Sequence, residues 1–375
     1  MSNVVNYGKF SQNTNFIAKD VDSKEFDLRI NNYFDIGSSN RFFIHNRRYL
    51  GSKYKLCPFI NWVYENKCFD IESVADIFAG TGVVAQMFNY FGKQVIVNDI
   101  LQSNYLIYQT FFSDEKINYS KLEDIIFDFN LLNIAEENYF SQNFGDSFFT
   151  MENARKIGYI REEIDNMGNI NSREKSILIT SLIYATDKVA NTCGHYDAYR
   201  RKLDTTQELK LLMPCIEDKY NKNNRIFKED ANQLVKKVKT DLVYIDTPYN
   251  SRQYGDAYHL LENLAEWKKP EVFGVVKKMK DRKKTKSKYC TVKATETFED
   301  LITNINSKFI LVSYNNMAEK GSGRSNAKIS HEEIVEILSN KGDVEIFSSN
   351  YKAFTTGKSN INNHKELLYF CEVRD

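Results

Sequence analysis

The chain has 375 residues, 42% hydrophobic and 27% charged, with 16 Gly, 4 Pro and 6 Cys. These proportions are typical of a globular protein and exclude collagen-like, disulfide-scaffold and fully disordered classes. The formal net charge is +1, but residues 268–288 contain ten Lys or Arg and only two acidic residues, so positive charge is concentrated in one segment. Such a local cluster predicts phosphate contacts, and a solvated lysine-rich loop is the alternative.

The first predicted elements form a strand–turn–helix–strand unit. Residues 1–40 are polar and Asn-rich, which indicates a loosely ordered lead-in. After it, apolar spacing predicts a helix over 56–64, a strand over 74–78, a helix over 83–91 and a strand over 94–97. This order is typical of the opening of a parallel α/β sheet.

The pattern becomes helical between residues 103 and 224. Leu122 to Phe129 and Ser176 to Ala190 have helical spacing, without strand alternation. Further strands are predicted over 225–227, 242–245, 309–312, 344–346 and 367–370. We therefore predict an α/β, Rossmann-like, mostly parallel sheet with helices on both faces, formed by 41–102 and 225–375, and a mostly helical insertion over 103–224.

A glycine-rich turn closes the first strand of this unit. Gly80 and Gly82 fit the pattern G-x-G-x-x-A with Ala85, and glycines there let the backbone approach a ligand at a helix N-terminus. Asp99 follows the next strand, where an acid can bind ribose hydroxyls. The pair predicts an adenosine-containing cofactor, but it does not separate a nicotinamide enzyme from a methyltransferase that uses S-adenosylmethionine.

Asp246-Thr247-Pro248-Tyr249 follows the strand over 242–245 and favours the methyltransferase. An exocyclic amino group is a poor nucleophile, because its lone pair is delocalised into the ring. Two acceptors can hold its two N–H groups and stabilise the charge that develops during transfer. The Asp246 carboxylate supplies one, and the Thr247 carbonyl supplies the other, since a residue before proline is extended. Tyr249 offers a flat face for a base rotated out of the duplex.

These motifs, in this order, resemble those of the Dam-like N6-adenine DNA methyltransferases, including type II restriction–modification methylases. Asp246 to Tyr249 is similar to their D-P-P-Y motif, with Thr247 in place of the first proline. Arg48 to Tyr54 resembles their N-terminal cofactor motif, and Phe227 to Ala231 a later one. The cofactor-binding residues that we expect are Tyr49, Gly51, Lys53, Asp76, Phe78, Gly80, Gly82, Asp99 and Asp230.

The resemblance implies methyl transfer from S-adenosylmethionine to adenine N6 in double-stranded DNA by base flipping and direct displacement. It leaves open a cognate restriction endonuclease as a second partner. By position, residues 103–224 correspond to the family's target-recognition region, where His195, Tyr196, Tyr199, Arg200 and Arg201 are candidates for contacts with bases or phosphates. An exposed helix end with no role in DNA binding is the alternative for these residues. In the basic run, the residues expected to contact DNA phosphates are Lys283, Lys284 and Lys286.

Other functions remain as alternatives. A close variant methylates cytosine N4 or an RNA adenine, since both need an amino group held between two acceptors. A nicotinamide-dependent oxidoreductase would need a catalytic Tyr-Lys or His group, and none is recognisable. A silent DNA-binding module is disfavoured by the intact acid and aromatic of Asp246 to Tyr249.

Composition also bears on location and metals. No run approaches about 18 apolar residues and no signal peptide is visible, so no membrane span is expected. Scattered cysteines without a C-x-x-C pair predict reduced thiols in a cytoplasmic protein. The five histidines lack ligand spacing, so we expect no metal site.

Overall fold

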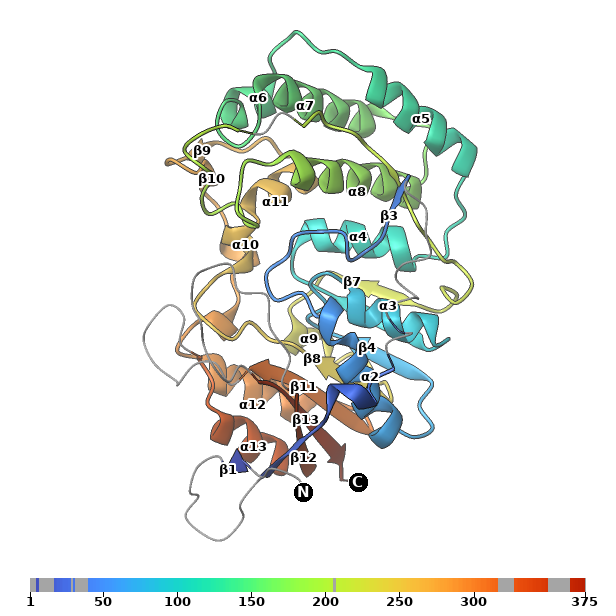
Figure 1. Ribbon diagram of the computed structural model, residues 1–375, viewed down its shortest axis with the longest axis vertical. Helices are drawn as coiled ribbons and strands as arrows, with labels where there is room; N and C mark the ends of the chain where they lie inside the picture. Colours follow the sequence, from blue (N-terminus) through green and yellow to red (C-terminus); the bar gives the residue numbers. More distant parts are fainter. Residues whose placement is uncertain are drawn as a thin grey trace.

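A mixed, mostly parallel sheet runs through the computed structural model, which describes residues 5–6, 17–27, 30, 40–204, 207–315, 327–349 and 365–374 (Figure 1). Within these residues, nine strands pair in the order β1-β2-β12-β13-β11-β8-β4-β5-β7. Their bounds are β1 (Val5–Asn6), β2 (Ile17–Asp20), β4 (Ser73–Asp76), β5 (Gln94–Asn98), β7 (Arg225–Phe227), β8 (Leu242–Ile245), β11 (Phe309–Asn315), β12 (Gly342–Ser349) and β13 (Glu366–Val373). β13 is antiparallel to both of its neighbours, and β1 to β2, whereas all other pairs are parallel. The predicted fold class is confirmed.

The register of the central strands brings their carboxyl ends to one edge. β4 lies between β5 and β8, and Asp76 at its end pairs with Val97 on one side and Tyr244 on the other. Ligands of open parallel sheets bind outside the carboxyl ends of such strands. The residues that follow β4, β5 and β8 therefore lie together.

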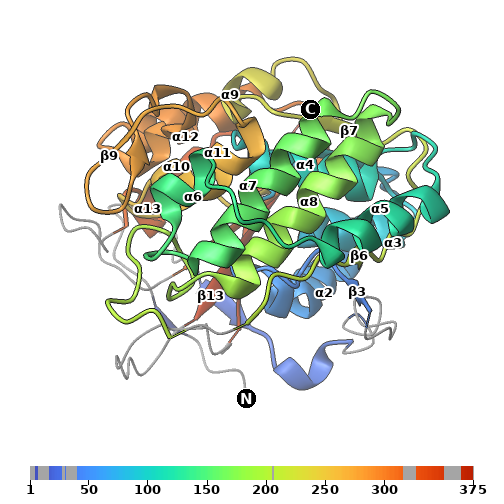
Figure 2. The same cartoon turned by 90° about the horizontal axis from the view of Figure 1, so that it is seen from above.

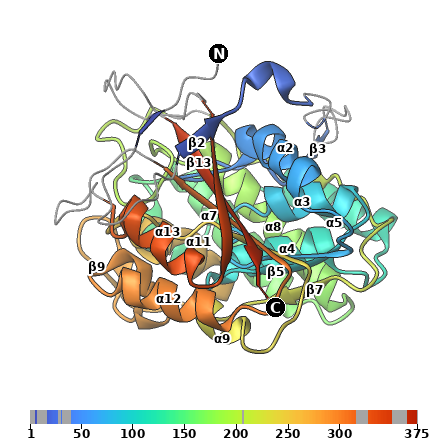
Figure 3. The ribbon, with the colours of Figure 1, turned by 90° about the horizontal axis from the view of Figure 1, so that it is seen from below.

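Helices cover both faces of the sheet because its strands are apolar on both sides. Val74 and Leu242 belong to one buried cluster, whereas their neighbours Ala75 and Val243 belong to the other. This alternation is the two-residue period of a strand. Figure 3 shows the strands between two pairs of helices, which are α2 (Cys57–Lys67) and α3 (Val83–Tyr90), and α12 (Ala294–Asn304) and α13 (His331–Ser339).

Helices dominate the region between β5 and β7. They are α4 (Gln102–Phe112), α5 (Tyr119–Leu131), α6 (Tyr139–Phe144), α7 (Met151–Asn166) and α8 (Ser172–Val189). Figure 2 shows α7 and α8 lying side by side above α4. α8 begins at a capping box, in which Asn171 and Glu174 each accept a backbone N–H of the other. Most residues of α8 are buried on every side, so this helix is the centre of the helical layer.

The segment over 246–293, between β8 and α12, passes along the carboxyl edge of the sheet. It contains α10 (Tyr254–Ala257), α11 (His259–Glu266), a hairpin of β9 (Val272–Phe273) and β10 (Lys278–Met279), and the 3₁₀ turns η3 (Lys283–Thr285) and η4 (Lys288–Cys290). The remaining elements are η1 (Ser23–Glu25), β3 (Arg41–Phe42), η2 (Tyr54–Leu56), β6 (Met213–Pro214) and α9 (Ala231–Leu234).

The lead-in contains two strands that the sequence does not predict, β1 and β2. Most of residues 1–40 lie outside the described residues, but Ile17–Asp20 pairs in parallel with β12 as β2. Its pairing partner lies more than 300 residues later, so local spacing carries no sign of it. Among the described residues, no helix is long and apolar enough to span a membrane, and no group of three His, Cys, Asp or Glu residues is placed to hold a metal ion.

Candidate active site

A pocket of about 1030 Å³, open mouth included, lies at the carboxyl edge of β4, β5 and β8. The four residues of the acid–aromatic motif line it, as do all but one of the residues expected to bind the cofactor. These lining residues are Asp246, Thr247, Pro248, Tyr249, Tyr49, Gly51, Lys53, Asp76, Phe78, Gly80, Asp99 and Asp230. The exception is Gly82. The residues that the sequence analysis selects thus lie in one pocket, although they come from segments up to about 200 positions apart in the chain.

The glycine-rich turn needs both of its glycines, for different reasons. Gly80 has φ +52° and lines the pocket, and a Cβ there would lie 3.0 Å from the Tyr49 ring. Gly82 has φ +81° and begins α3, and a Cβ there would lie 2.9 Å from the Ile44 side chain and 3.1 Å from the Tyr108 ring. These left-handed conformations favour glycine. Gly82 thus permits close packing beneath the pocket and does not line it.

Asp99 is fixed by three donors at the end of β5. Its carboxylate accepts the Gly80 N–H at 3.1 Å, the Leu101 N–H at 2.9 Å and the Asn104 side-chain amide at 2.9 Å. Burial raises the pKa of the Asp99 carboxyl, and these donors oppose the rise. A carboxylate has about four acceptor positions. Asp99 therefore keeps capacity for a ligand hydroxyl, in an orientation that the protein has already set.

Asp76 presents a carboxylate oxygen without a partner among the described residues. The residue is 1% exposed, and its Oδ2 accepts the Ala85 N–H at 3.2 Å, whereas Oδ1 is buried with no hydrogen bond. Burial raises the pKa of Asp76 well above its ordinary value, and the nearby Asp246 carboxylate adds to the rise. A buried acceptor without a partner costs free energy. A cationic ligand group in the pocket would supply the partner and keep Asp76 ionised.

Asp246 forms an ion pair with Lys53 across the pocket. The Lys53 Nζ lies 3.0 Å from Asp246 Oδ1 and also donates to the Gly51 carbonyl at 3.4 Å. Burial raises the pKa of Asp246, and the Lys53 ammonium opposes this rise. Burial by itself lowers the pKa of Lys53, but Asp246 and Glu366 outweigh it, so that pKa is raised. Lys53 therefore favours the ionised, hydrogen-bond-accepting form of Asp246.

Thr247 and Tyr249 are held in place after Asp246. Thr247 is 3% exposed. The Tyr249 carbonyl accepts the Lys328 N–H at 2.9 Å and the Tyr314 hydroxyl at 3.3 Å, and the two tyrosine rings meet edge-on. The loop after β8 is thus tied to β11, and the Tyr249 ring lines the pocket.

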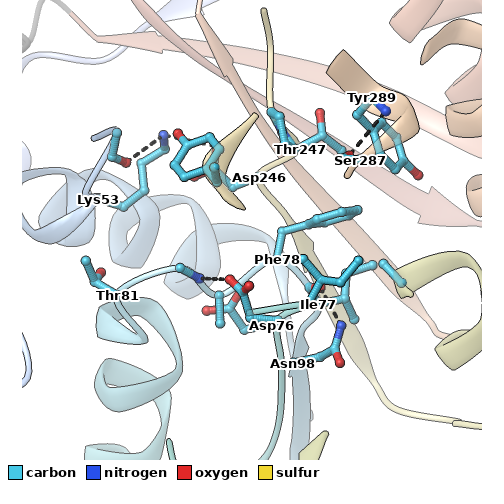
Figure 4. Close-up of a pocket in the computed structure, with 18 of the residues that line it drawn as sticks. Lys53, Asp76, Ile77, Phe78, Thr81, Asn98, Asp246, Thr247, Ser287 and Tyr289 are labelled. Atoms are coloured by element: carbon cyan, nitrogen blue, oxygen red, sulfur yellow. Dashed lines mark hydrogen bonds and ion pairs between the residues drawn. The ribbon is translucent and has the colours of Figure 1, made fainter. Parts of the chain in front are cut away.

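Several residues that line the pocket are absent from the sequence prediction; two of them lie in the basic run over 268–288, and a third follows it directly. Thr285, Ser287 and Tyr289 line the pocket, and the Tyr289 ring meets Phe78 edge-on at 5.1 Å and 83°. Figure 4 shows Ser287 and Tyr289 on the far side of Thr247 from Lys53. The sequence feature that could have indicated them is the alternation of lysines with hydroxyl-bearing residues over 284–289, which is the two-residue period of an extended segment with two different sides.

The residues expected to contact DNA lie outside the pocket. Lys283, Lys284 and Lys286 are exposed around η3. Arg200 and Arg201 are also exposed, in the loop after α8, and do not line the pocket. Exposure is compatible with phosphate contacts at both places, and the two DNA-contact predictions remain untested.

Tyr196 is the expected DNA contact that the structure contradicts. It is 1% exposed, its hydroxyl donates to Asp187 Oδ1 at 2.6 Å, and its N–H donates to the Ala257 carbonyl. A ring buried in this way cannot reach a base. Tyr196 instead anchors the loop after α8 to the segment that follows the acid–aromatic motif.

Comparison with known proteins decides the family. Residues 49–320, well over half of the chain, match the model for "D12 class N6 adenine-specific DNA methyltransferase". The chain belongs to this family. The D12 class match begins at Tyr49 and contains every residue that lines the pocket.

Three similar proteins show how this D12 class chain compares in length. It is 37% identical over 350 residues to the modification methylase StsI of Streptococcus sanguinis, covering 87% of this chain and 52% of that protein. It is 33% identical over 320 residues to the type II methyltransferase M.FokI of Planomicrobium okeanokoites, covering 80% and 48%. It is 29% identical over 348 residues to M.NlaIII of Neisseria lactamica, covering 86% and 98%. The chain thus spans about half the length of the first two and nearly all of the third.

Proposed function

We propose that this chain transfers a methyl group from S-adenosylmethionine to adenine N6 in double-stranded DNA. The observation that carries the proposal is a single pocket that joins the G-x-G turn and Asp99 to the acid–aromatic motif after β8. The family is dependent on S-adenosylmethionine, and the pocket has groups that fit this molecule. When bound, the cofactor supplies an electrophilic methyl group on a sulfonium.

The cofactor fits the pocket by the chemistry of the residues present. Asp76 offers its unpartnered oxygen to the ammonium of the methionine part, and Asp99 accepts the ribose hydroxyls. Phe78 and Asp230, with Tyr289 beside them, surround the adenine ring. Tyr49 and Gly51 complete the wall from the N-terminal motif.

Asp246 and Thr247 hold the amino group of the target base. The Asp246 carboxylate accepts one N–H and the Thr247 carbonyl the other, which directs the nitrogen lone pair toward the methyl group. Asp246 and the Thr247 carbonyl would stabilise the positive charge that develops on this nitrogen as it takes the methyl group from the sulfonium, and Asp246 would accept the N–H proton that the methylated amino group then loses. Tyr249 stacks on the base, which has left the duplex. Proline at position 248 keeps Thr247 extended, so threonine is accepted where relatives of the D-P-P-Y type have proline.

The proposal also covers how this chain recognises DNA and whether it acts together with an endonuclease. We infer that residues 103–224 carry target recognition and that Arg200 and Arg201 contact the duplex, with the lysines of the basic run on its phosphates. The relatives are named modification methylases or type II methyltransferases. We accordingly propose that this chain modifies DNA within a restriction–modification system that includes a cognate endonuclease.

The test is methyl transfer from tritiated S-adenosylmethionine to double-stranded DNA, followed by nucleoside analysis. N6-methyladenine is the expected product. N4-methylcytosine would overturn the choice of base, and transfer to RNA alone would overturn the choice of polymer. No transfer despite cofactor binding would support a silent DNA-binding module, and binding of NAD in place of S-adenosylmethionine would support an oxidoreductase.

A further inference from the structure

The segment Arg282–Cys290, which we call the strap, presents different side chains to its two sides. Thr285, Ser287 and Tyr289 line the pocket. The lysines that alternate with them are exposed, and these are Lys284, Lys286 and Lys288. The backbone is extended at Lys286 and Ser287, where successive side chains point to opposite sides. The strap thus has a pocket face and a cationic outer face.

The strap is joined to the segment that follows the acid–aromatic motif. Reading backward along that segment, Asp256 pairs with Arg282 at 2.6 Å. Gly255 faces Thr285, and a Cβ on Gly255 would lie 2.2 Å from the Thr285 hydroxyl. The strap and the segment over 252–256 therefore run antiparallel to each other in close contact.

The second half of the strap continues this pairing. The Gln253 side chain accepts the Ser287 N–H at 2.8 Å and donates to the Ser287 carbonyl at 3.1 Å. The Cys290 thiol donates to the Arg252 carbonyl at 3.2 Å. Only two residues separate Tyr249 from this segment over 252–256, so a displacement of the strap is transmitted next to the proposed position of the target base.

The inner face touches the side of the pocket where Phe78 lies. Tyr289 is 3% exposed, packs edge-on against Phe78, and donates from its hydroxyl to Asn232 Oδ1 at 2.8 Å. A molecule in the pocket is therefore covered from this side by the strap. Leaving the pocket on this side requires the strap to move.

We propose that the strap couples the two substrates, so that duplex DNA on its outer lysines retains the cofactor beneath its inner face. This inference rests on the proposed function, because it takes the pocket ligand to be S-adenosylmethionine. Phosphates bind the outer lysines without regard to sequence. To the extent that DNA raises the equilibrium affinity for the cofactor, bound cofactor raises the affinity for DNA by the same factor.

The experiment measures release of radiolabelled S-adenosylmethionine into an excess of unlabelled cofactor, with and without a saturating G·C duplex. Such a duplex contains no adenine, so methyl transfer does not consume the label. We expect DNA to slow release by at least about fivefold, the lower end of allosteric coupling in proteins. No binding of S-adenosylmethionine to the protein alone would refute the proposed function itself, whereas normal binding with equal release rates would overturn only the strap inference.

Two variants test which contacts carry the coupling. Replacing Lys284, Lys286 and Lys288 with Gln should abolish the slowing by DNA, measured at a duplex concentration that still saturates the variant. Gln253→Ala keeps the lysines and the lining residues but removes both hydrogen bonds between Gln253 and Ser287, and it too should abolish the slowing. Retention of the wild-type slowing by both variants would overturn the inference.

A matched control removes three positive charges at the opposite edge of the sheet. Lys239, Lys308 and Lys341 precede the amino ends of β8, β11 and β12, and none of them lines the pocket at the carboxyl ends. Their replacement with Gln makes the same change in net charge. We expect wild-type slowing from this control, and loss of slowing would show that total charge, not the strap, retains the cofactor.

Discussion

Lys53→Gln should move the acid limb of the pH–rate profile to higher pH. The proposed reaction needs Asp246 as a carboxylate, and burial already raises the pKa of this group. Lys53, with its Nζ 3.0 Å from Asp246 Oδ1, opposes that rise. Removing the ammonium lets the pKa rise further, so the carboxylate is lost at a higher pH than in the wild type.

The size of this shift follows from the geometry of the pair. The two side chains are only 13% and 23% exposed, so water and salt screen the interaction weakly. A charge-assisted hydrogen bond contributes about 1.5–3 kcal/mol. At 1.36 kcal/mol per pKa unit, the acid limb should move by about 1–2 units.

The assay is kcat/KM for tritiated-methyl transfer between acid and neutral pH. Lys53→Arg, which keeps the positive charge, should retain most of the wild-type acid limb. Lys55→Gln is the matched control, because Lys55 is exposed two residues away and does not line the pocket. Coincident acid limbs for wild type and Lys53→Gln would refute the role of Lys53.

Three further predictions concern the motif acid, the cofactor acid and the basic run. Asp246→Ala should lower turnover by on the order of 10²–10³ and leave S-adenosylmethionine affinity within a few fold, and near-normal turnover would remove it from the reaction. Asp99→Ala should weaken cofactor binding by roughly 1.5–3 kcal/mol in calorimetry with little effect on DNA binding, and unaltered affinity would exclude a ribose contact. Replacing Lys283, Lys284 and Lys286 with Gln should reduce the slope of log K against log salt by up to about 2–3 units while sequence preference survives, whereas superimposable slopes would show that these residues do not contact DNA.

The residues at the carboxyl ends of the central strands are predicted well from the sequence, because the patterns that mark these strand ends are local. An apolar run followed by the glycine-rich turn, or by Asp246, marks the end of a buried strand without knowledge of the rest of the fold. Residues that act through distant pairing leave no such mark. β2 (Ile17–Asp20) is polar in part, and its role depends on β12.

Contacts with residues distant in the sequence also explain two further differences between the sequence prediction and the structure, which concern the strap and Tyr196. For the basic run the sequence predicts phosphate contacts, with a solvated loop as the alternative. It does not predict that the hydroxyl residues between the lysines line the pocket, because hydroxyl residues are ordinary on a surface and the pairing with residues 252–256 turns these inward. Tyr196 reads as a base contact from its basic neighbours, but its hydroxyl is committed to Asp187. In both cases a side chain's direction is set by contacts that local sequence does not contain.

The strand order also has a consequence for how the chain folds. β13 lies between β11 and β12 and is built from residues 366–373, so one edge of β11 stays uncovered until this last segment is available. That edge belongs to an apolar strand, Phe309 to Val312, and an uncovered apolar edge is a template for intermolecular pairing. Ribosomal synthesis proceeds at roughly 5–20 residues per second, so the exposed edge persists for seconds on each nascent chain. We therefore expect truncation before Glu366 to yield aggregated protein, even though every residue that lines the pocket would still be present.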